Sequence, residues 1–441
     1  MDPVEKLTFD KIENIQIWSI IKDATPNYIF TTKWRSVNWN SVNDKTVLSQ
    51  VLELRFCTKH GLTNIIEKIT KQYKVNYPRS YNITDREKLN EFIKDYRLTA
   101  LMSSLKSILE MRLTKNPKFN PDGTIPYEMI DFIEQRSWEF INAHRLNKIN
   151  EIPWLTVEQE GRWKQFMIWY TKLLEENGTI RLTNSFQINN TYERFTYLVQ
   201  KLRTHTLQFD IDGSRNIWII KPSSSCSGYD IKLEKNVDKI SKLALPASKI
   251  QHYTIQKYIE NPLLIFNVKI DLRQYFLVTN FNQNKLWMYK EGYIRFCSKE
   301  YSITDLSENI HLSNVRIQSK YRKYRAQFVP EECMWSFEQF KQYLASTNNE
   351  NKWDNLIYPK MCETLISVFQ YSNMTVSNRF SFQLLGADFV LTTSLEPWLI
   401  EINSNPGLNP TTSIISKIAT RLLKDIVKGS LMQYYKCLFC N

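Results

Sequence analysis

Three oxygen-bearing side chains near the C-terminal end have the types and spacing of a cation site. In Glu401-Ile402-Asn403, the Glu and Asn side chains point to one face if the segment is a strand. The preceding run Ser381 to Thr392 is a second expected strand, joined to the first by a short Thr-Ser-Leu-Glu turn. If the two strands pair as a hairpin, Asp388 comes near Glu401. Oxygen donors on one sheet face suit Mg²⁺, which takes waters and substrate phosphates as its other ligands. The alternative is a solvated face, but the apolar lead-in Pro397 to Ile400 favours the metal, because buried carboxylates need a partner.

A second group of charged side chains alternates along one expected strand. Lys269, Asp271 and Arg273 are spaced i, i+2, i+4 and share a face. Such a row is what a polyphosphate requires, because arginine offers a planar fork to phosphate oxygens and lysine a point charge. The alternative is an ordinary surface strand with one charged and one apolar face.

Three further segments are weaker signals. Lys221 ends a short apolar strand and is followed by a Ser-rich loop to Gly228, whose N–H groups suit phosphate. The loop lacks the Walker order, and its local sequence alone favours an ordinary surface turn. The segment His311 to Asn314 contains one histidine, which alone is more typical of a structural residue. The run Lys320 to Arg325 interleaves cations with tyrosines, as in a surface for acidic tails or nucleic acid, or as in a solvated loop.

The elements that must position these residues are mostly strands in the C-terminal half. Strands are expected at 217–220, 253–259, 269–280, 285–296, 381–392 and 397–403, with a hairpin turn at 282–284. Helices are expected across most of 85–147 and at 158–175, 353–370 and 412–435; in the first of these, Leu89, Phe92, Ile93 and Tyr96 follow the helical period. Strands interrupted by helices indicate an α+β nucleotide-binding core.

Composition limits the classes of protein that remain. The 441 residues include 58 Lys and Arg against 45 Asp and Glu, a net charge of +13, which favours an acidic partner or reflects a genomic bias toward lysine codons. The seven cysteines include one C-x-x-C pair, Cys437 and Cys440, without further zinc ligands nearby, so reduced thiols and an intracellular protein are expected. No signal peptide or membrane span is expected. The net charge alone leaves nucleic acid, an anionic membrane and an acidic polypeptide open as the acidic partner.

Taken in order, these segments resemble the tubulin-tyrosine-ligase-like family, over about residues 55–430. The matching runs are IWIIKP (217–222), IQKYIENPLL (255–264), KIDLR (269–273), FLVT (276–279), YKEGYIRF (289–296), HLSN (311–314), SFQLLGAD (381–388) and WLIEIN (398–403). Upstream, TKHGL (58–62), YPRSY (77–81) and FIKDYRLTALMSSL (92–105) look like the glycylase branch, as do RQY (273–275) and IRF (294–296).

The resemblance implies an α+β ATP-grasp fold with an N-terminal α/β lobe. The expected domains are an N-terminal lobe at 1–100, a mostly helical lobe at 101–215 and the ATP-grasp core at 216–430. It also implies ATP and Mg²⁺ as cofactors and assigns roles by position. It assigns nucleotide contacts to Lys221, Gly228, the backbone of Gln256, Lys257, Tyr258 and Ile259, and Lys269, Asp271 and Asn314. It assigns the metal to Asp388, Glu401 and Asn403. It assigns catalytic roles to Arg273 and Arg295 and, by a looser match, to Lys59.

The implied activity is ATP-dependent addition of free glycine to glutamate γ-carboxylates of tubulin C-terminal tails, through an acylphosphate. Tubulin tails and microtubules are the implied partners, whereas nucleic acid and membrane are not expected. The implied locations are the cytoplasm, the cytoskeleton, the ciliary axoneme and the basal body. One departure stands out: Ser227, Gly228 and Tyr229 stand where the family usually has Arg-Gly-Arg, so the loop glycine is kept without its cations. Ser225 also stands where glycylases tend to have a cation. Two alternatives remain open, a tubulin polyglutamylase and a catalytically weak ATP-grasp protein that binds microtubule tails.

Overall fold

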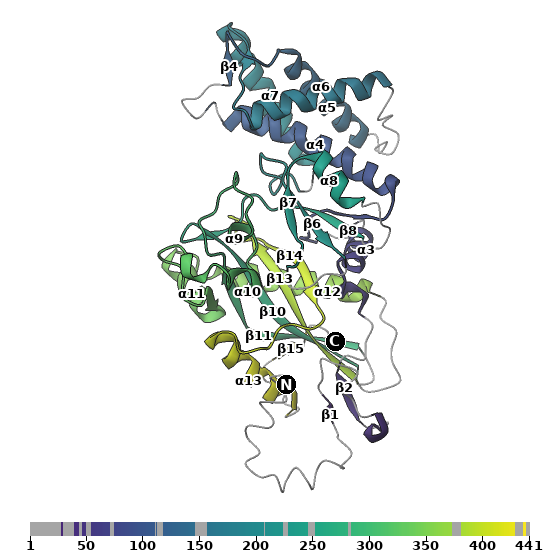
Figure 1. Ribbon diagram of the computed structural model, residues 1–441, viewed down its shortest axis with the longest axis vertical. Coiled ribbons are helices and arrows are strands. Elements are labelled where there is room, and N and C mark those ends of the chain that lie inside the picture. The colour runs from purple at the N-terminus through teal and green to yellow at the C-terminus, as the bar shows by residue number, and fades with distance from the viewer. Residues whose placement is uncertain are drawn as a thin grey trace. The chain divides into compact units, whose positions relative to one another are not determined.

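The computed structural model describes residues 28–29, 39–43, 46–49, 54–70, 75–110, 112, 118–145, 157–206, 208–223, 228–245, 252–280, 284–372, 381–427 and 435–437 (Figure 1). The chain forms two compact units, one from Met1–Tyr77 with Pro262–Asn441 and the other from Pro78–Asn261. The boundaries expected near residues 100 and 215 both lie inside the second unit. They do so because a strand before residue 100 pairs with one after residue 215 in a single sheet.

The first unit is built on a nine-stranded sheet, counted over the described residues. Its main order is β1 (Tyr28–Ile29), β2 (Val47–Ser49), β13 (Ser381–Leu391), β10 (Val268–Asn280), β11 (Asn284–Phe296) and β12 (Met334–Ser336). Three more strands join it: β14 (Pro397–Asn403) on β13, β9 (Leu264–Ile265) on β10, and β15 (Tyr435–Cys437) on β11. The antiparallel hairpins β10–β11 and β13–β14 confirm the two expected strand pairs.

The two faces of this sheet pack against different helices. Alternate residues such as Ile270, Leu272 and Ala387 face a core shared with α3 (Lys59–Ile69), α11 (Phe337–Ser346) and α12 (Tyr358–Tyr371). The opposite face packs Tyr275 and Leu277 under α13 (Ser413–Val427). Lys269, Asp271 and Arg273 have the parity of this second face, so the charged row continues the strand surface on which α13 lies.

Helix ends in this unit differ in part from expectation. The expected helix at 353–370 begins with a π-helical turn, Trp353–Ile357, and continues as α12. The helix expected to reach Tyr435 was wrong at its end, because Tyr435 instead pairs with Tyr289 of β11. The remaining helical elements of the unit are short: 3₁₀ turns at Trp39–Ser41, Arg55–Cys57 and Arg322–Tyr324, and α9 (Glu308–His311) and α10 (Val315–Gln318).

The second unit combines a small sheet with a helical bundle. Over the described residues, its antiparallel sheet has four strands in the order β3 (Ser80–Ile83), β8 (Tyr253–Lys257), β6 (Trp218–Pro222) and β7 (Lys232–Glu234). Helix α8 (Val237–Ala244) packs on this sheet. The bundle contains α5 (Glu128–Arg145), α6 (Val157–Leu174) and α7 (Ser185–His205), with the two-stranded pair β4 (Phe119–Asn120) and β5 (Ile180–Arg181).

The long helix α4 (Arg86–Glu110) joins these two parts of the second unit. Its first half packs Leu89, Phe92 and Tyr96 against the small sheet, and its second half, from Ala100 to Ile108, enters the bundle core. The helical period expected from the sequence is therefore confirmed at its buried positions. Among the described residues, no helix is long and apolar enough to span a membrane.

Candidate active site

Four buried charged side chains interlock on the sheet face of the first unit. Strand register places Asp271 opposite Arg295 and Arg273 opposite Asp388. Arg295 Nε donates to Asp271 Oδ1 over 2.7 Å, and Arg273 donates to both carboxylate oxygens of Asp388, with Nη2 to Oδ2 at 2.9 Å. Arg295 Nη2 also lies 3.0 Å from Asp388 Oδ2, so the two pairs form one network. This confirms that the charged row shares a face.

The network fixes the protonation state of its central carboxylate. Burial alone would raise the pKa of Asp388, but the guanidinium groups of Arg273 and Arg295 hold it well below its ordinary value. The two arginines and two aspartates have no net charge together. Any further cation beside them is therefore not neutralised within the network.

Lys269 is such a cation. Its side chain is buried, with 5% exposed, and within the described ranges it has no hydrogen-bond or ion-pair partner. A buried ammonium without a counterion is costly unless a ligand supplies the negative charge. The arrangement therefore favours an anion at the Lys269 end of the charged row.

The expected metal ligands converge on the same face. The β13–β14 register pairs Asp388 with Glu401 and Gly386 with Asn403, and an irregularity beyond Asp388 leaves Ile400 without a direct partner. Asn403 Nδ2 lies 3.3 Å from Glu401 Oε1 and 3.5 Å from Asp388 Oδ2. A partial positive charge thus stands between the two carboxylates. With the amide turned over, its oxygen would join theirs as a donor set for a hard cation.

This donor set fits Mg²⁺ better than a metal held wholly by protein. In the described part of the chain, no group of three or more His, Cys, Asp and Glu side chains is placed to hold a metal. Two carboxylates and one amide leave several positions of an octahedral ion to waters and phosphates, as Mg²⁺ prefers. Asp388, Glu401 and Asn403 are the residues that would hold it.

Close packing explains why the first residue of the Gly386-Ala387-Asp388 run is a glycine. A Cβ there would lie 2.9 Å from Pro406 Cβ and 3.1 Å from Arg273 Cδ. Both approaches are tighter than ordinary contacts, so the missing side chain lets Arg273 lie across β13 toward Asp388. The glycine therefore helps to position the guanidinium.

In the segment from His311 to Asn314, the histidine has a structural role, whereas the asparagine side chain can contact a ligand. His311 Nε2 lies 2.7 Å from the carbonyl oxygen of Asp305, and burial lowers the pKa of His311 to about 4, so the ring is neutral at pH 7. Asn314 precedes α10, is half-buried, and its side chain has no hydrogen bond within the described residues. Asn314 can therefore contact a ligand, whereas His311 supports the loop.

The second unit holds the other expected nucleotide residues. Buried Lys221 Nζ donates to Gln256 Oε1 over 2.6 Å across β6 and β8. Lys257 uses its side chain internally, donating to Glu260 Oε1 at 2.8 Å and to the Ile217 carbonyl at 2.9 Å. Any ligand contact of Lys257 must therefore be through its backbone, as expected.

The backbone of this segment is only partly occupied. The amide of Lys257 donates to the Arg79 carbonyl, and that of Tyr258 donates to the Ile217 carbonyl. The amide of Ile259 has no hydrogen-bond partner in the part of the chain that the structure describes. Ile259 therefore offers the free donor that an adenine ring nitrogen can accept.

The loop after Lys221 is only partly described. Gly228 has φ +78°, a left-handed conformation that glycine adopts without strain. Ser225 and Ser227, where the sequence departs from the family pattern, lie outside the described residues, as do Cys226 and Cys440.

Sequence reasoning missed one supporting residue. Arg79, in the Y-P-R-S-Y run, forms ion pairs with Asp95 and Asp212 and donates to Thr99 Oγ1 over 2.8 Å. Its carbonyl accepts the Lys257 amide, so Arg79 fixes the end of β8. Asp212 is 133 positions away from Arg79, too far for the sequence to indicate the pairing.

Lys59 is the candidate with least structural support. It lies in the first turn of α3, whose buried side chains pack on the sheet face opposite to Arg273 and Asp388. Its catalytic role stays a prediction.

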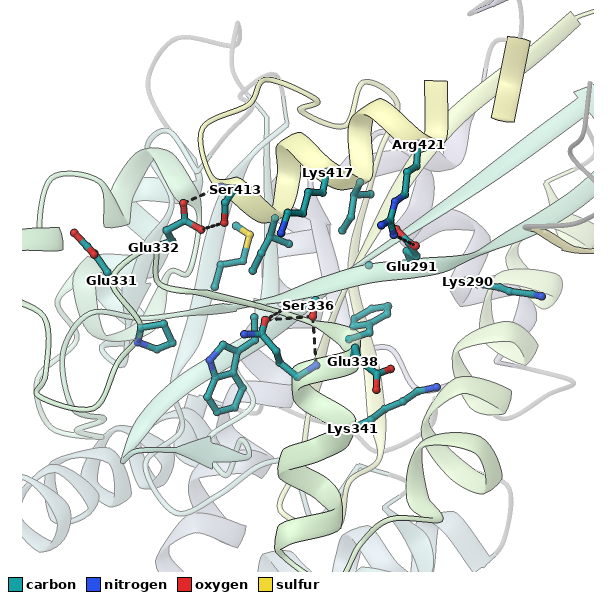
Figure 2. A pocket seen from close by; sticks show the side chains of 18 residues that line it. Lys290, Glu291, Glu331, Glu332, Ser336, Glu338, Lys341, Ser413, Lys417 and Arg421 are labelled. Atoms are coloured by element: carbon teal, nitrogen blue, oxygen red, sulfur yellow. Dashed lines mark hydrogen bonds and ion pairs between the residues drawn. The ribbon is translucent and has the colours of Figure 1, made fainter. Parts of the chain in front are cut away.

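A cavity of about 710 Å³ opens elsewhere in the first unit, between β12, the start of α11 and α13 (Figure 2). Lys417 and Arg421 of α13 line one side, and Ser336, Glu338 and Lys341 line the other. Arg421 is paired with Glu291 at 2.7 Å. The lining includes four acidic and four basic side chains, so the cavity has no preference for a ligand of either sign.

Comparison with known proteins gives consistent results. The chain is 36% identical over 358 residues to Tubulin glycylase 3A of Drosophila melanogaster, covering 80% of this chain and 36% of that protein. It is 29% identical over 473 residues to Protein monoglycylase TTLL8 of Homo sapiens, covering 96% and 54%. It is also 29% identical over 440 residues to Tubulin monoglycylase TTLL3 of Danio rerio, covering 93% and 56%. The chain thus spans about a third to just over half of the length of these relatives.

A family profile matches more than half of the chain. The description of the profile is tubulin-tyrosine ligase family, and the matched residues are 142–437. This range includes the whole charged network and the β13–β14 ligand set. The expected resemblance and the α+β, ATP-grasp-like fold class are confirmed, and the chain belongs to the tubulin-tyrosine ligase family.

Proposed function

We propose that this chain is an ATP-dependent carboxylate–amine ligase that adds glycine to glutamate γ-carboxylates in tubulin C-terminal tails. The observation that carries the proposal is a sheet face with a neutral network of two aspartates and two arginines. Beside it lie the Glu401–Asn403 pair and Lys269, which has no ion-pair partner among the residues that the structure describes. Such a face suits a substrate that carries several negative charges and a metal. The relatives named as glycylases support glycine as the amine.

The chemistry proceeds in two steps. An oxygen of the tail carboxylate attacks the γ-phosphorus of ATP, which releases ADP and leaves an acylphosphate. The glycine amine then attacks the acyl carbon, loses a proton and expels inorganic phosphate, which forms an isopeptide bond. Mg²⁺, when bound, neutralises charge on the phosphates.

The protein's part is positioning and charge neutralisation. Lys269 supplies a point charge at a phosphate oxygen, and Arg273 and Arg295 offer planar forks to the transferred phosphate or the incoming amino acid. Their aspartate partners hold both guanidinium groups rigidly before substrate arrives. Preorganised charges of this kind require little rearrangement during the reaction.

The second unit carries the other residues to which we assign nucleotide contacts. Lys221 contacts phosphate, the free amide of Ile259 reads the adenine, and Gly228 allows the loop backbone to approach the phosphates. We further propose microtubules as the partner and the cytoplasm, with ciliary axonemes and basal bodies, as the location.

The direct test is glycine incorporation by the purified chain. Tubulin, Mg²⁺, ATP and labelled glycine should yield label in the tails, with stoichiometric ADP and phosphate, and omission of any one component should prevent it. Tandem mass spectrometry should place glycine on a glutamate γ-carboxyl. Incorporation on an α-carboxyl terminus, or without ADP release, would contradict the proposal.

A second candidate is a tail-binding protein with weak catalysis, favoured by the serines at 225 and 227, where the family carries cations. Such a protein gains little thermal stability from Mg-ATP. Strong Mg-ATP stabilisation together with turnover excludes it. If Lys232, which is exposed on β7 next to Ile220, has replaced the lost cations, then Lys232→Ala lowers turnover and Ser227→Arg does not raise it.

A further inference from the structure

The segment from Arg316 to Phe328 is strongly basic and exposes aromatic rings. It contains five cations and no acidic residue: Arg316, Lys320, Arg322, Lys323 and Arg325. Tyr324 is 78% exposed and Phe328 67%, among the most exposed large apolar side chains of the described residues. Exposed rings beside cations on one short segment are a combination that a ligand can use.

The segment is fixed in place. The Ala326 amide donates to the Ser298 carbonyl over 2.7 Å, and the Ser298 amide donates to Gln318 Oε1 over 2.8 Å. Ser298 follows Arg295 by three residues, so these bonds attach the basic segment to the chain just beyond the charged network. The Phe328 ring lies 6.1 Å from that of Phe266, between centroids.

Not all of the cations are available. Lys320 pairs with Glu308 at 3.0 Å, and Arg325 donates to the carbonyls of Val329 and Arg322 at 3.2 and 3.3 Å. The side chains of Arg322 and Lys323, in contrast, have no hydrogen-bond or ion-pair partner within the described ranges. These two charges and the two rings remain for a ligand.

We propose that Arg322, Lys323, Tyr324 and Phe328, the Arg322–Phe328 surface, dock an extended acidic peptide rich in glutamate. The proposal rests on the proposed function, because an acidic tail must bring one carboxylate to Arg273 and Arg295. Charge complementarity selects the peptide, and the rings can cover the methylene groups of glutamate side chains. The cavity of Figure 2, with equal numbers of acidic and basic side chains, lacks this preference.

A peptide suits the surface better than a nucleic acid does. Phosphate backbones are usually bound by many cations along a track. Of the five cations in this segment, only Arg322 and Lys323 have no partner among the described residues. Two exposed ion pairs give modest affinity, which suits a docking step that must release its product. The docked part of the tail is distinct from the glutamate that reacts.

The test is binding of a fluorescent polyglutamate peptide to the full chain without nucleotide, so that no turnover occurs. Arg322→Ala with Lys323→Ala should raise the Kd about fivefold, the size expected for two exposed ion pairs. The control is Lys68→Ala with Lys352→Ala, which removes two exposed lysines of the same unit and should leave the Kd unchanged. High salt should abolish the difference. Tyr324→Ser with Phe328→Ser should weaken binding even in high salt.

Two further arms separate the possible failures. With a short peptide holding one glutamate, the Arg322/Lys323 double variant should glycylate as wild type does, whereas with the long tail it should show a higher KM. Peptide binding equal to wild type in both double variants of the surface would overturn the docking surface even if glycylation occurs. Surface-dependent peptide binding without glycine incorporation would instead contradict only the proposed function. Binding of single-stranded DNA is measured in parallel with binding of the peptide. If the Arg322/Lys323 double variant loses DNA binding but keeps peptide binding, the surface binds nucleic acid and the proposal is overturned.

Discussion

Replacing Lys269 by methionine should separate ligand binding from folding. The substitution keeps an unbranched side chain of similar length but removes the charge. Lys269 is buried and, within the described residues, has no hydrogen bond to lose. The ligand-free variant should therefore melt no lower than wild type, whereas its response to Mg-ATP should fall.

The size of the effect follows from the phosphate contact. A hydrogen bond to a charged group contributes about 1.5–3 kcal/mol. A loss of about 2 kcal/mol raises the Kd about 30-fold. At an ATP concentration about 100 times the wild-type Kd, ATP stabilises the wild-type fold by about 2.7 kcal/mol and the variant by about 0.9 kcal/mol. For a unit of this size that is a Tm shift of roughly 5–11 °C in wild type and roughly 2–4 °C in the variant.

The assay is thermal unfolding with and without Mg-ATP, followed by fluorescence. Lys352→Met, at an exposed lysine of the same unit, is the matched control and should keep the full shift. An undiminished shift in Lys269→Met would refute the phosphate role of this lysine. A lower melting temperature without ligand would show instead that its charge stabilises the fold.

Three other substitutions test the site and its supports. Glu401→Gln should abolish ligation with an unchanged circular dichroism spectrum, and near wild-type turnover would contradict its role as a metal ligand. Gly386→Ala should lower the free energy of unfolding by about 1–3 kcal/mol and also slow turnover, because its methyl group crowds Pro406 and Arg273; unchanged stability and rate would show that the neighbours yield. Burial lowers the pKa of His311 from its ordinary 6.5 to about 4 in the folded protein. Neutral His311 therefore contributes about 3 kcal/mol to the free energy of unfolding; this contribution is complete above pH 6.5 and is lost as the pH falls toward 4. In His311→Gln this component of the pH dependence, measured by urea unfolding, should disappear.

The alternation of residues within single segments was sufficient to predict which candidate site residues share a sheet face. Strict alternation placed Lys269, Asp271 and Arg273 together, and the short turn between two apolar runs predicted that Asp388 would lie near Glu401. These features depend on the period of a strand, which is readable in one segment.

Features that depend on pairing between distant segments were not predictable in this way. The contact of Arg295 with Asp388 requires the registers of β10 with both β11 and β13. The ion pair of Arg79 with Asp212 joins residues 133 positions apart, and the unit boundaries follow from β3 pairing with β8. That Lys269 has no partner among the described residues is also not visible in the sequence, because it depends on what every neighbouring element supplies.

The central claim is tested most directly by offering the purified chain labelled glycine and labelled glutamate in parallel, with tubulin and Mg-ATP. The account predicts that glycine enters the tubulin tails, that glutamate does not, and that Glu401→Gln abolishes the glycine signal. Incorporation of glutamate in place of glycine would show a polyglutamylase. Incorporation of neither, under conditions where a known glycylase labels the same tubulin, would contradict the assignment of this chain as an active ligase.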